Sequence, residues 1–279
     1  MRVLRTPEEQ FADLPDFPYP PRYAAVGGVR LAYVEAGPPD GEPVLLLHGE
    51  PSWSFLYRTV MPVLADAGLR AIAPDLAGFG RSDKPMNVSD HSFARHVEWI
   101  RALAFDRLDL HGLTLVGQDW GGLIGLRLAA EHPGRFARVV AANTGLPTGD
   151  QPMPDVWLRF REVVQTAPVL SVSRLVQSGC QTTLPPAVLA AYDAPFPDES
   201  FAAAVRAMPG LVPGGQPGVR RHHPGEASRM LGRQPQPDEA TPVLPDQRHP
   251  LQVQHVESQF PYPFDVARVA VVLDASRLV

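Results

Sequence analysis

The chain lacks the features on which several protein classes depend. Cys180 is the only cysteine, which excludes a disulfide framework within one chain and a cysteine-rich zinc site. No apolar run approaches the roughly 18 residues that a membrane-spanning helix needs, and residues 1–21 lack the apolar segment of a signal peptide. The net charge is −5, so there is no strong basic field for nucleic acid. We expect a cytoplasmic protein that binds neither nucleic acid nor membrane.

What is present indicates a folded enzyme-sized domain. Of the 279 residues 44% are hydrophobic and 20% are charged, a balance that favours a globular chain over a disordered one. This length is sufficient for one large domain or two small ones with a buried core.

Short apolar runs alternate with stretches of helical spacing through the first half of the chain. Runs of this kind suit strands that are buried on both faces of a parallel sheet. The pattern predicts an α/β fold with a mostly parallel sheet flanked by helices, and with ligand chemistry at the carboxyl ends of the strands. The expected strands are Val29–Glu35, Val44–His48, Leu69–Asp75, Leu113–Gly117 and Val139–Asn143, and the expected helices are Tyr57–Ala67, Phe93–Phe105 and Gly122–Glu131.

Two further segments depart from this alternation. Residues 147–212 contain helical stretches at Val156–Val164 and Pro186–Tyr192 but no strand-like run, which predicts an inserted helical cap after a core at 1–146. Residues 213–279 hold ten prolines and form a divergent tail rich in Pro, Arg and Gln, in which only Val266–Leu273 is apolar enough for a regular element. The C-terminal part of the fold is therefore expected to be atypical or incomplete.

The chemistry is carried by Gly117-Gln-Asp-Trp-Gly121, which follows a buried strand and precedes a helix rich in small residues. This is the form of a nucleophile elbow, Gly-x-Nuc-x-Gly, with Asp119 at the nucleophile position. A carboxylate there is able to form a covalent ester. The alternative is that Asp119 only caps the helix, as aspartates commonly do.

Two neighbouring loops favour the catalytic interpretation. His48-Gly-Glu-Pro51 ends an earlier strand at the same sheet edge, where a second backbone N–H could complete an oxyanion hole. The loop Asp75–Asp83 follows the next strand to that edge. We interpret His48 as a strand-end residue rather than a base.

Taken together, these motifs resemble the haloalkane dehalogenases of the α/β-hydrolase superfamily, over roughly three quarters of the chain. The resemblance lies in the combination, since no single motif is specific. The matching stretches are Leu4–Pro7, Phe17–Tyr19, His48–Pro51, Asp75–Pro85, Val116–Gly122 and Tyr192–Asp198.

The resemblance implies a role for each matching residue. Asp119 matches the nucleophile that displaces halide from a saturated carbon, and Trp120 the first halide-binding residue. Trp157 resembles the second halide-binding tryptophan, although it could simply pack in the cap. The backbone N–H groups of Glu50 and Trp120 would form the oxyanion hole. The expected enzyme is a monomer that acts on a small halogenated aliphatic substrate with water, and it needs no metal or organic cofactor.

The second half of such a mechanism has no clear counterpart. The family places its histidine base in a Gly-His-Phe stretch near the C-terminus, and this chain has none. His255 is the least unsuitable histidine, and Asp246 is a weak candidate for the acid. We therefore hypothesise a frameshifted or replaced tail and lost turnover. The alternatives are a divergent but functional tail, an epoxide hydrolase, and a catalytically inactive remnant or binding protein.

Overall fold

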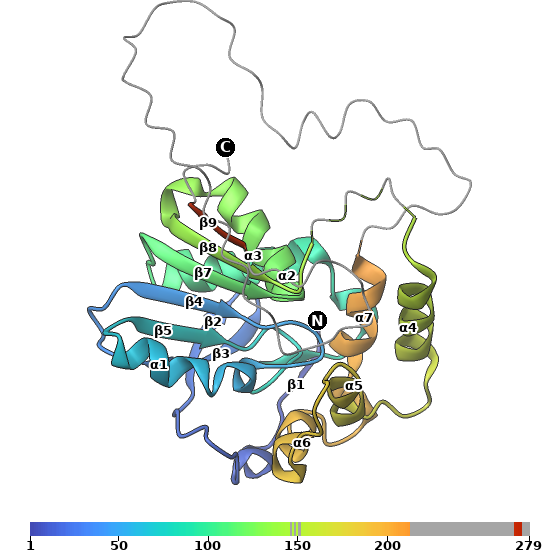
Figure 1. The fold of residues 1–279 in the computed structure, drawn as a ribbon. Coiled ribbons are helices and arrows are strands. Elements are labelled where there is room, and N and C mark those ends of the chain that lie inside the picture. Colours follow the sequence, from blue (N-terminus) through green and yellow to red (C-terminus); the bar gives the residue numbers. More distant parts are fainter. Residues whose placement is uncertain (146, 148, 150–151, 213–270, 275–279) are drawn as a thin grey trace, which may run out of the picture.

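The computed structural model describes residues 1–145, 147, 149, 152–212 and 271–274, and its centre is a twisted sheet (Figure 1). Within the described residues the sheet has seven strands, in the order β2-β3-β5-β4-β7-β8-β9. The four central strands, β5, β4, β7 and β8, run parallel to one another. Strands β2, β3 and β9 pair antiparallel with their neighbours. The bounds are Arg22–Val26 (β2), Val29–Ala36 (β3), Pro43–Leu47 (β4), Arg70–Pro74 (β5), Leu113–Gln118 (β7), Phe136–Ala142 (β8) and Val271–Asp274 (β9).

The central strands form the core because both of their faces are covered. Leu45, Leu46 and Leu47 of β4 are fully buried, as expected for a strand with helices on either side. Helix α1 (Val60–Asp66) packs against β3 and β5, while α3 (Trp120–Glu131) packs against β4, β7 and β8 and also against α2 (Phe93–Arg101). The predicted mostly parallel sheet flanked by helices is confirmed.

Several short elements lie outside the main sheet and its long helices. Strands β1 (Val3–Leu4) and β6 (Lys84–Pro85) pair antiparallel in a separate small sheet. The predicted helix over Phe93–Phe105 is α-helical only to Arg101, and a π-helical segment follows it. The one-turn elements are η1 (Glu8–Phe11), η2 (Ser54–Tyr57), η3 (Val88–Asp90), η4 (Ala102–Arg107), η5 (Pro133–Arg135) and η6 (Glu199–Phe201).

Four helices between β8 and the tail lie together at one end of the sheet (Figure 1). They contact the loops that follow β4 and β5: the Trp53 indole N–H donates to the carbonyl of Ala191 over 3.0 Å, and a Cβ added to Gly78 would lie 2.2 Å from that of Ala204. The helical cap therefore lies over the carboxyl ends of the strands. The helices are α4 (Asp155–Thr166), α5 (Val172–Ser178), α6 (Pro186–Asp193) and α7 (Ala203–Leu211).

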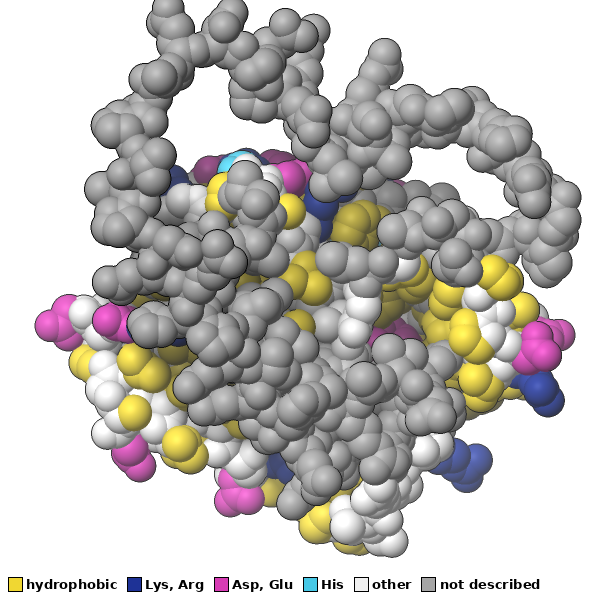
Figure 2. Space-filling view, turned by 45° about the horizontal axis from the view of Figure 1, so that its top comes forward, with side chains coloured by type: hydrophobic (Ala, Val, Ile, Leu, Met, Phe, Trp, Pro, Cys, Tyr) yellow, Lys and Arg dark blue, Asp and Glu magenta, His cyan; other side chains and the backbone are white. Residues whose placement is uncertain are grey.

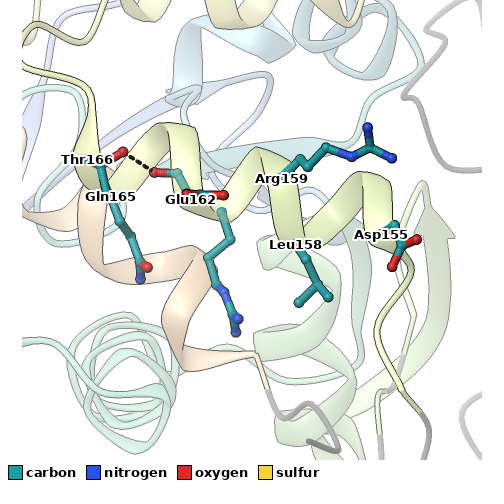
Figure 3. Close-up of a pocket in the computed structure, with 7 residues that line it drawn as sticks. Asp155, Leu158, Arg159, Glu162, Gln165 and Thr166 are labelled. Carbon is teal, nitrogen blue, oxygen red and sulfur yellow. Dashed lines mark hydrogen bonds between the residues drawn. The ribbon is translucent and has the colours of Figure 1, made fainter. Parts of the chain in front are cut away.

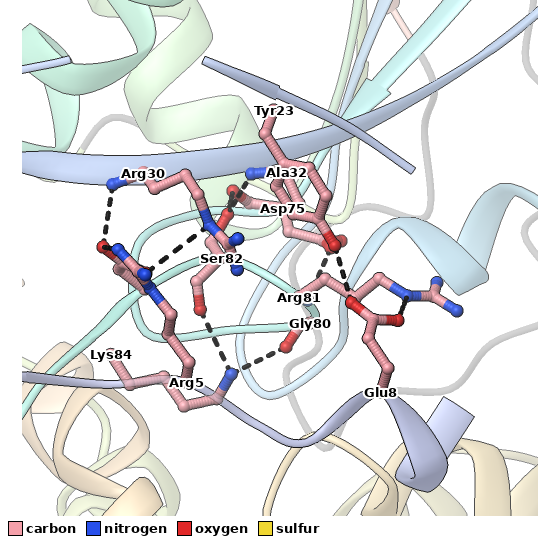
Figure 4. Close-up of polar contacts among 11 residues, drawn as sticks. Arg5, Glu8, Tyr23, Arg30, Ala32, Asp75, Gly80, Arg81, Ser82 and Lys84 are labelled. Atoms are coloured by element: carbon pink, nitrogen blue, oxygen red, sulfur yellow. Dashed lines mark hydrogen bonds and ion pairs between the residues drawn. The ribbon is translucent and has the colours of Figure 1, made fainter. Parts of the chain in front are cut away.

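A buried polar network holds the loop after β5 in place (Figure 4). The Asp75 carboxylate accepts hydrogen bonds from the backbone N–H groups of Ser54 and Arg81, at 2.9 and 2.8 Å. The Lys84 ammonium donates to the carbonyls of Gly80 and Ser82, and burial lowers its pKa to about 7. Because buried polar groups must be paired, this network fixes the loops beside the strand ends.

Sequence patterns predicted the cap helices and the tail less completely than the sheet. Helices α5 and α7 were not predicted, because they are only seven and nine residues long and α7 contains Pro209. Strand β9 overlaps the one apolar stretch noted in the tail, and its backbone pairs with β8. The remaining tail, with His255, Asp246 and the proposed frameshift, lies outside the described residues. Across the described residues, we find no helix with the length and apolar character required to cross a bilayer.

Candidate active site

The tight turn between β7 and α3 is the structural basis of the site. Asp119 occupies this turn with φ 51° and ψ −119°, a conformation that costs a non-glycine residue about 1–3 kcal/mol. Small neighbours make the turn possible: a Cβ on Gly121 would lie 1.9 Å from the carbonyl oxygen of Leu47, and one on Gly122 would lie 2.3 Å from Thr144 Oγ1. The geometry is that of an elbow, which presents the side chain at the strand end.

The Asp119 carboxylate faces two backbone donors. The N–H of Glu50 donates to Oδ1 over 2.9 Å, and the N–H of Trp120 also hydrogen bonds to the carboxylate. The residue is partly accessible, yet loss of hydration outweighs these two bonds and raises the pKa of Asp119 to about 6. At neutral pH the carboxylate is therefore ionised, poorly hydrated and oriented, as a nucleophile requires.

Its own backbone holds Asp119 in this orientation. The carbonyl of Asp119 accepts from the N–H of Gly122 at 2.9 Å and from Thr144 Oγ1 at 2.7 Å. Its N–H donates to the carbonyl of Ala142. In the described structure the Asp119 carboxylate meets the N–H of Trp120, the first residue of α3, but makes no N-cap hydrogen bond to the residues that follow. Because it also accepts from Glu50 on a separate loop, capping alone does not account for its position.

Glu50 contributes a second buried carboxyl group. Its side chain is 5% exposed, and Oε1 has no hydrogen-bond partner among the described residues. Burial, followed by the charge of Asp119, raises the pKa of Glu50 well above its usual value. A protonated Glu50 avoids placing two negative charges side by side.

The two predicted halide-binding tryptophans come from different parts of the fold. Trp120 is 3% exposed at the start of α3, directly after Asp119. Trp157 is 8% exposed on α4, where the Arg161 guanidinium stacks on its ring at 5.0 Å. Among the described residues neither indole N–H donates a hydrogen bond, which contrasts with Trp53 and Trp99, whose indoles donate to the carbonyls of Ala191 and Gly27.

The comparisons with known proteins identify the family. The α/β hydrolase fold family matches residues 42–201. A haloalkane dehalogenase of Psychrobacter cryohalolentis is 51% identical over 218 residues, covering 76% of this chain and 72% of that protein. A haloalkane dehalogenase of Mycobacterium marinum is 49% identical with 76% and 73% coverage. The chain belongs to the haloalkane dehalogenases. It is thus a hydrolase of the class that acts on carbon–halide bonds, and the predicted α/β-hydrolase fold is confirmed.

Solved structures agree with this assignment. The dehalogenase DpaA from Paraglaciecola agarilytica NO2 is 40% identical, with a TM-score of 0.73 and coverage of 77% of this chain and 73% of that chain. DbeA from Bradyrhizobium elkani is 28% identical, with a TM-score of 0.63. DpaA is described as tetrameric, so the monomer expected for this dehalogenase remains a prediction.

One cavity in the described part of this dehalogenase lies away from Asp119, on the exposed side of α4 (Figure 3). Its volume is about 540 Å³. Hydrophobic side chains also gather on the flank where α4 lies (Figure 2), and Val156 and Val163 of α4 are exposed. The cavity contains none of the predicted site residues; its lining is Asp155, Leu158, Arg159, Arg161, Glu162, Gln165 and Thr166.

Histidines of the described region do not supply an obvious base. Both ring nitrogens of His48 are hydrogen-bonded within 2.9 Å to the backbone, in agreement with its interpretation as a strand-end residue. His91 and His96 stack on each other, and burial lowers the pKa of His96 to about 3. Gly49 and Gln118 belong to the two motifs singled out in the sequence, but the hydrogen bond between them was not predicted, because it arises only when β4 and β7 lie side by side.

Proposed function

We propose that this dehalogenase cleaves haloalkanes through an alkyl–aspartyl ester on Asp119. The observation that supports the proposal best is a poorly hydrated carboxylate, held at an elbow and faced by the N–H groups of Glu50 and Trp120. An aspartate that only caps a helix would not be expected to accept a hydrogen bond from the loop after another strand, as Asp119 does from Glu50. The reaction at a carbon–halide bond is proposed because the relatives named above are haloalkane dehalogenases.

In the first step a carboxylate oxygen of Asp119 attacks the carbon that bears the halogen. The new C–O bond forms as the C–X bond breaks, and the electron pair leaves with the halide. Trp120 and Trp157 would direct their indole N–H groups at this anion. A neutral donor suits halide, because it stabilises the leaving group without binding it too tightly for release.

In the second step a water molecule adds to the ester carbonyl carbon of Asp119. The negative charge that develops on the carbonyl oxygen is stabilised by the N–H groups of Glu50 and Trp120. Collapse releases the alcohol and restores the carboxylate, while the proton of water passes to a base. Our candidates for the base and its acid, His255 and Asp246, belong to the part of the tail that is not described. The hypothesis of lost turnover predicts that the reaction stops at the ester.

Intact mass spectrometry with a 1-bromoalkane tests the proposal directly. We expect one equivalent of alkyl group on the protein, placed on Asp119 by peptide mapping, together with one bromide released per chain. Continued bromide release over many turnovers would show that a base is present and would reject the lost-turnover hypothesis. Neither adduct nor bromide would reject the proposed function and favour an inactive remnant.

The epoxide hydrolase alternative has less support. Such an enzyme needs a tyrosine to protonate the epoxide oxygen, and the only candidate in the cap was Tyr192. Its side chain is 4% exposed, its ring packs edge-on against Phe55, and its hydroxyl hydrogen bonds to Arg58. We accordingly expect no diol from styrene oxide under conditions that alkylate Asp119.

The tryptophans can be tested with matched substitutions. We expect Trp120→Phe and Trp157→Phe each to slow bromide release about tenfold to a hundredfold, because a hydrogen bond to a charged group contributes about 1.5–3 kcal/mol. Trp99→Phe is the control, since its indole makes only a 3.4 Å contact with Gly27. Equal rates for the three variants would contradict the halide-binding role, and a normal rate for Trp157→Phe alone would leave it as a packing residue of the cap.

A further inference from the structure

His48 is fully buried directly after β4, and both of its ring nitrogens have backbone partners. The N–H of Leu76 donates to Nε2 over 2.9 Å. Because a backbone N–H can only donate, Nε2 is unprotonated, and the hydrogen of the neutral ring is on Nδ1. Nδ1 lies 2.9 Å from the carbonyl of Gly49 and therefore donates to it. Burial also lowers the pKa of His48, which favours this neutral form.

The carbonyl of Gly49 belongs to the same peptide group as the N–H of Glu50. It accepts from His48 Nδ1 and, at 2.9 Å each, from the N–H and Oγ of Ser52. A trans peptide is planar, and its C=O and N–H point in opposite directions. Holding the carbonyl of Gly49 on one side thus directs the N–H of Glu50 to the other side, where it meets Asp119 Oδ1 at 2.9 Å.

The preceding peptide is held as well. The N–H of Gly49 donates to Gln118 Oε1 over 3.1 Å, and a Cβ on Gly49 would lie 2.4 Å from Asp119 Oδ1. The loop therefore approaches the nucleophile so closely that a small rotation of its backbone would either break the bond to Glu50 or produce a clash.

We infer that His48 is a positioning residue, which fixes the Gly49–Glu50 peptide so that the Glu50 N–H is directed at Asp119. It connects the loop after β5, through Leu76, to the donor that faces the nucleophile. His48 is not a base in this arrangement, because neither ring nitrogen is available to accept a proton from water. The inference rests on the proposed function, in which this N–H stabilises the oxyanion formed as the ester is hydrolysed.

Two substitutions of His48 each keep one of its two hydrogen bonds and remove the other. The amide of His48→Asn occupies the place of Nδ1 and keeps a donor for the carbonyl of Gly49, but it does not reach Leu76. The amide of His48→Gln extends to the place of Nε2 and keeps an acceptor for Leu76, but it removes the donor that His48 supplies to the carbonyl of Gly49, which then accepts only from the N–H and Oγ of Ser52. Each variant loses one buried hydrogen bond, so similar losses of stability in denaturant are expected.

The variants should differ in the lifetime of the alkyl-enzyme, which intact mass spectrometry follows after excess 1-bromoalkane is removed. We expect His48→Gln to slow decay of the ester about tenfold to a hundredfold, because a displaced oxyanion donor loses its effect on the transition state. His48→Asn should decay at close to the wild-type rate. Equal slowing in both variants, or greater slowing in His48→Asn, would overturn the inference and leave His48 a structural residue.

A second measurement tests the role of His48 without requiring that the ester forms. In protein labelled with ¹⁵N-glutamate, the amide proton of Glu50 should resonate far downfield, because it donates to a carboxylate. We expect this signal to move upfield in His48→Gln and to stay in place in His48→Asn. If the wild-type ester does not decay, as lost turnover predicts, or if no ester forms and the proposed function fails, this signal alone decides the role of His48: an unmoved signal in His48→Gln would overturn it.

Discussion

Asp119→Asn is expected to abolish both the alkyl adduct and bromide release. The substitution keeps the shape of the side chain and leaves an oxygen for the N–H groups of Glu50 and Trp120. It removes the carboxylate proposed to attack carbon, and a neutral amide is a far poorer nucleophile than a carboxylate. The measurement is intact mass after incubation with 1-bromoalkane, with bromide determined in the same sample.

The same variant should be more stable than the wild type, in a pH-dependent way. The pKa of Asp119 is about 6 in the folded protein and 3.8 as a reference value. The folded state thus binds this proton more tightly, so the wild type loses stability as pH rises from about 4 through 6. At 1.36 kcal/mol per pKa unit, the difference reaches about 3 kcal/mol above pH 7, and it should fall to about 0.5 kcal/mol at pH 4.

Asp40→Asn is the control for this prediction, because Asp40 is exposed and lies on a turn before β4. It should neither change the reaction nor alter the pH dependence of stability. Urea denaturation of the three proteins between pH 4 and pH 8 gives the comparison. A stability difference for Asp119→Asn that does not change with pH would contradict the proposed burial of the charge, and a retained adduct would place the nucleophile elsewhere.

Gly121→Ala is expected to cause the largest loss of stability among the glycine substitutions at the elbow. The new Cβ would lie 1.9 Å from the carbonyl oxygen of Leu47 and 2.8 Å from that of His48, and both obstacles are backbone atoms. Side chains cannot rotate to relieve such a contact, so β4 and α3 must separate. We expect the free energy of unfolding to fall by about 3 kcal/mol or more, at the upper end of overpacking effects.

Gly134→Ala is the matched control, because nothing lies within 4 Å of the Cβ it would add. Its free energy of unfolding should stay within about 0.5 kcal/mol of the wild type, as for other surface substitutions. Gly121→Ala should also reduce alkylation, since displacing the end of β4 moves the loop that carries Glu50. Equal denaturation midpoints for the two variants would show that the elbow is not as tightly packed as the structure indicates.

Local patterns in the sequence were sufficient for the sheet and for the identity of the elbow. The run that ends at Leu47 and the run before Asp119 predict parallel strands because buried strands are continuously apolar. The glycines at 117 and 121 indicate a tight turn, because a strand and a helix can approach each other closely only where the side chains are small. The cap helices α5 and α7 were missed, since they are short, α7 contains Pro209, and their helical form depends on packing against the rest of the cap.

The sequence alone therefore predicted Asp119 as the nucleophile and indicated which loops would reach its edge of the sheet. Only the tertiary structure decided that the Glu50 N–H meets the carboxylate, that the pKa of Asp119 rises, and that His48 and Gln118 fix the facing loop. Those contacts join residues about 70 positions apart, such as Glu50 and Asp119. Hydration and hydrogen-bond geometry depend on which atoms are neighbours in space, and no local pattern records that.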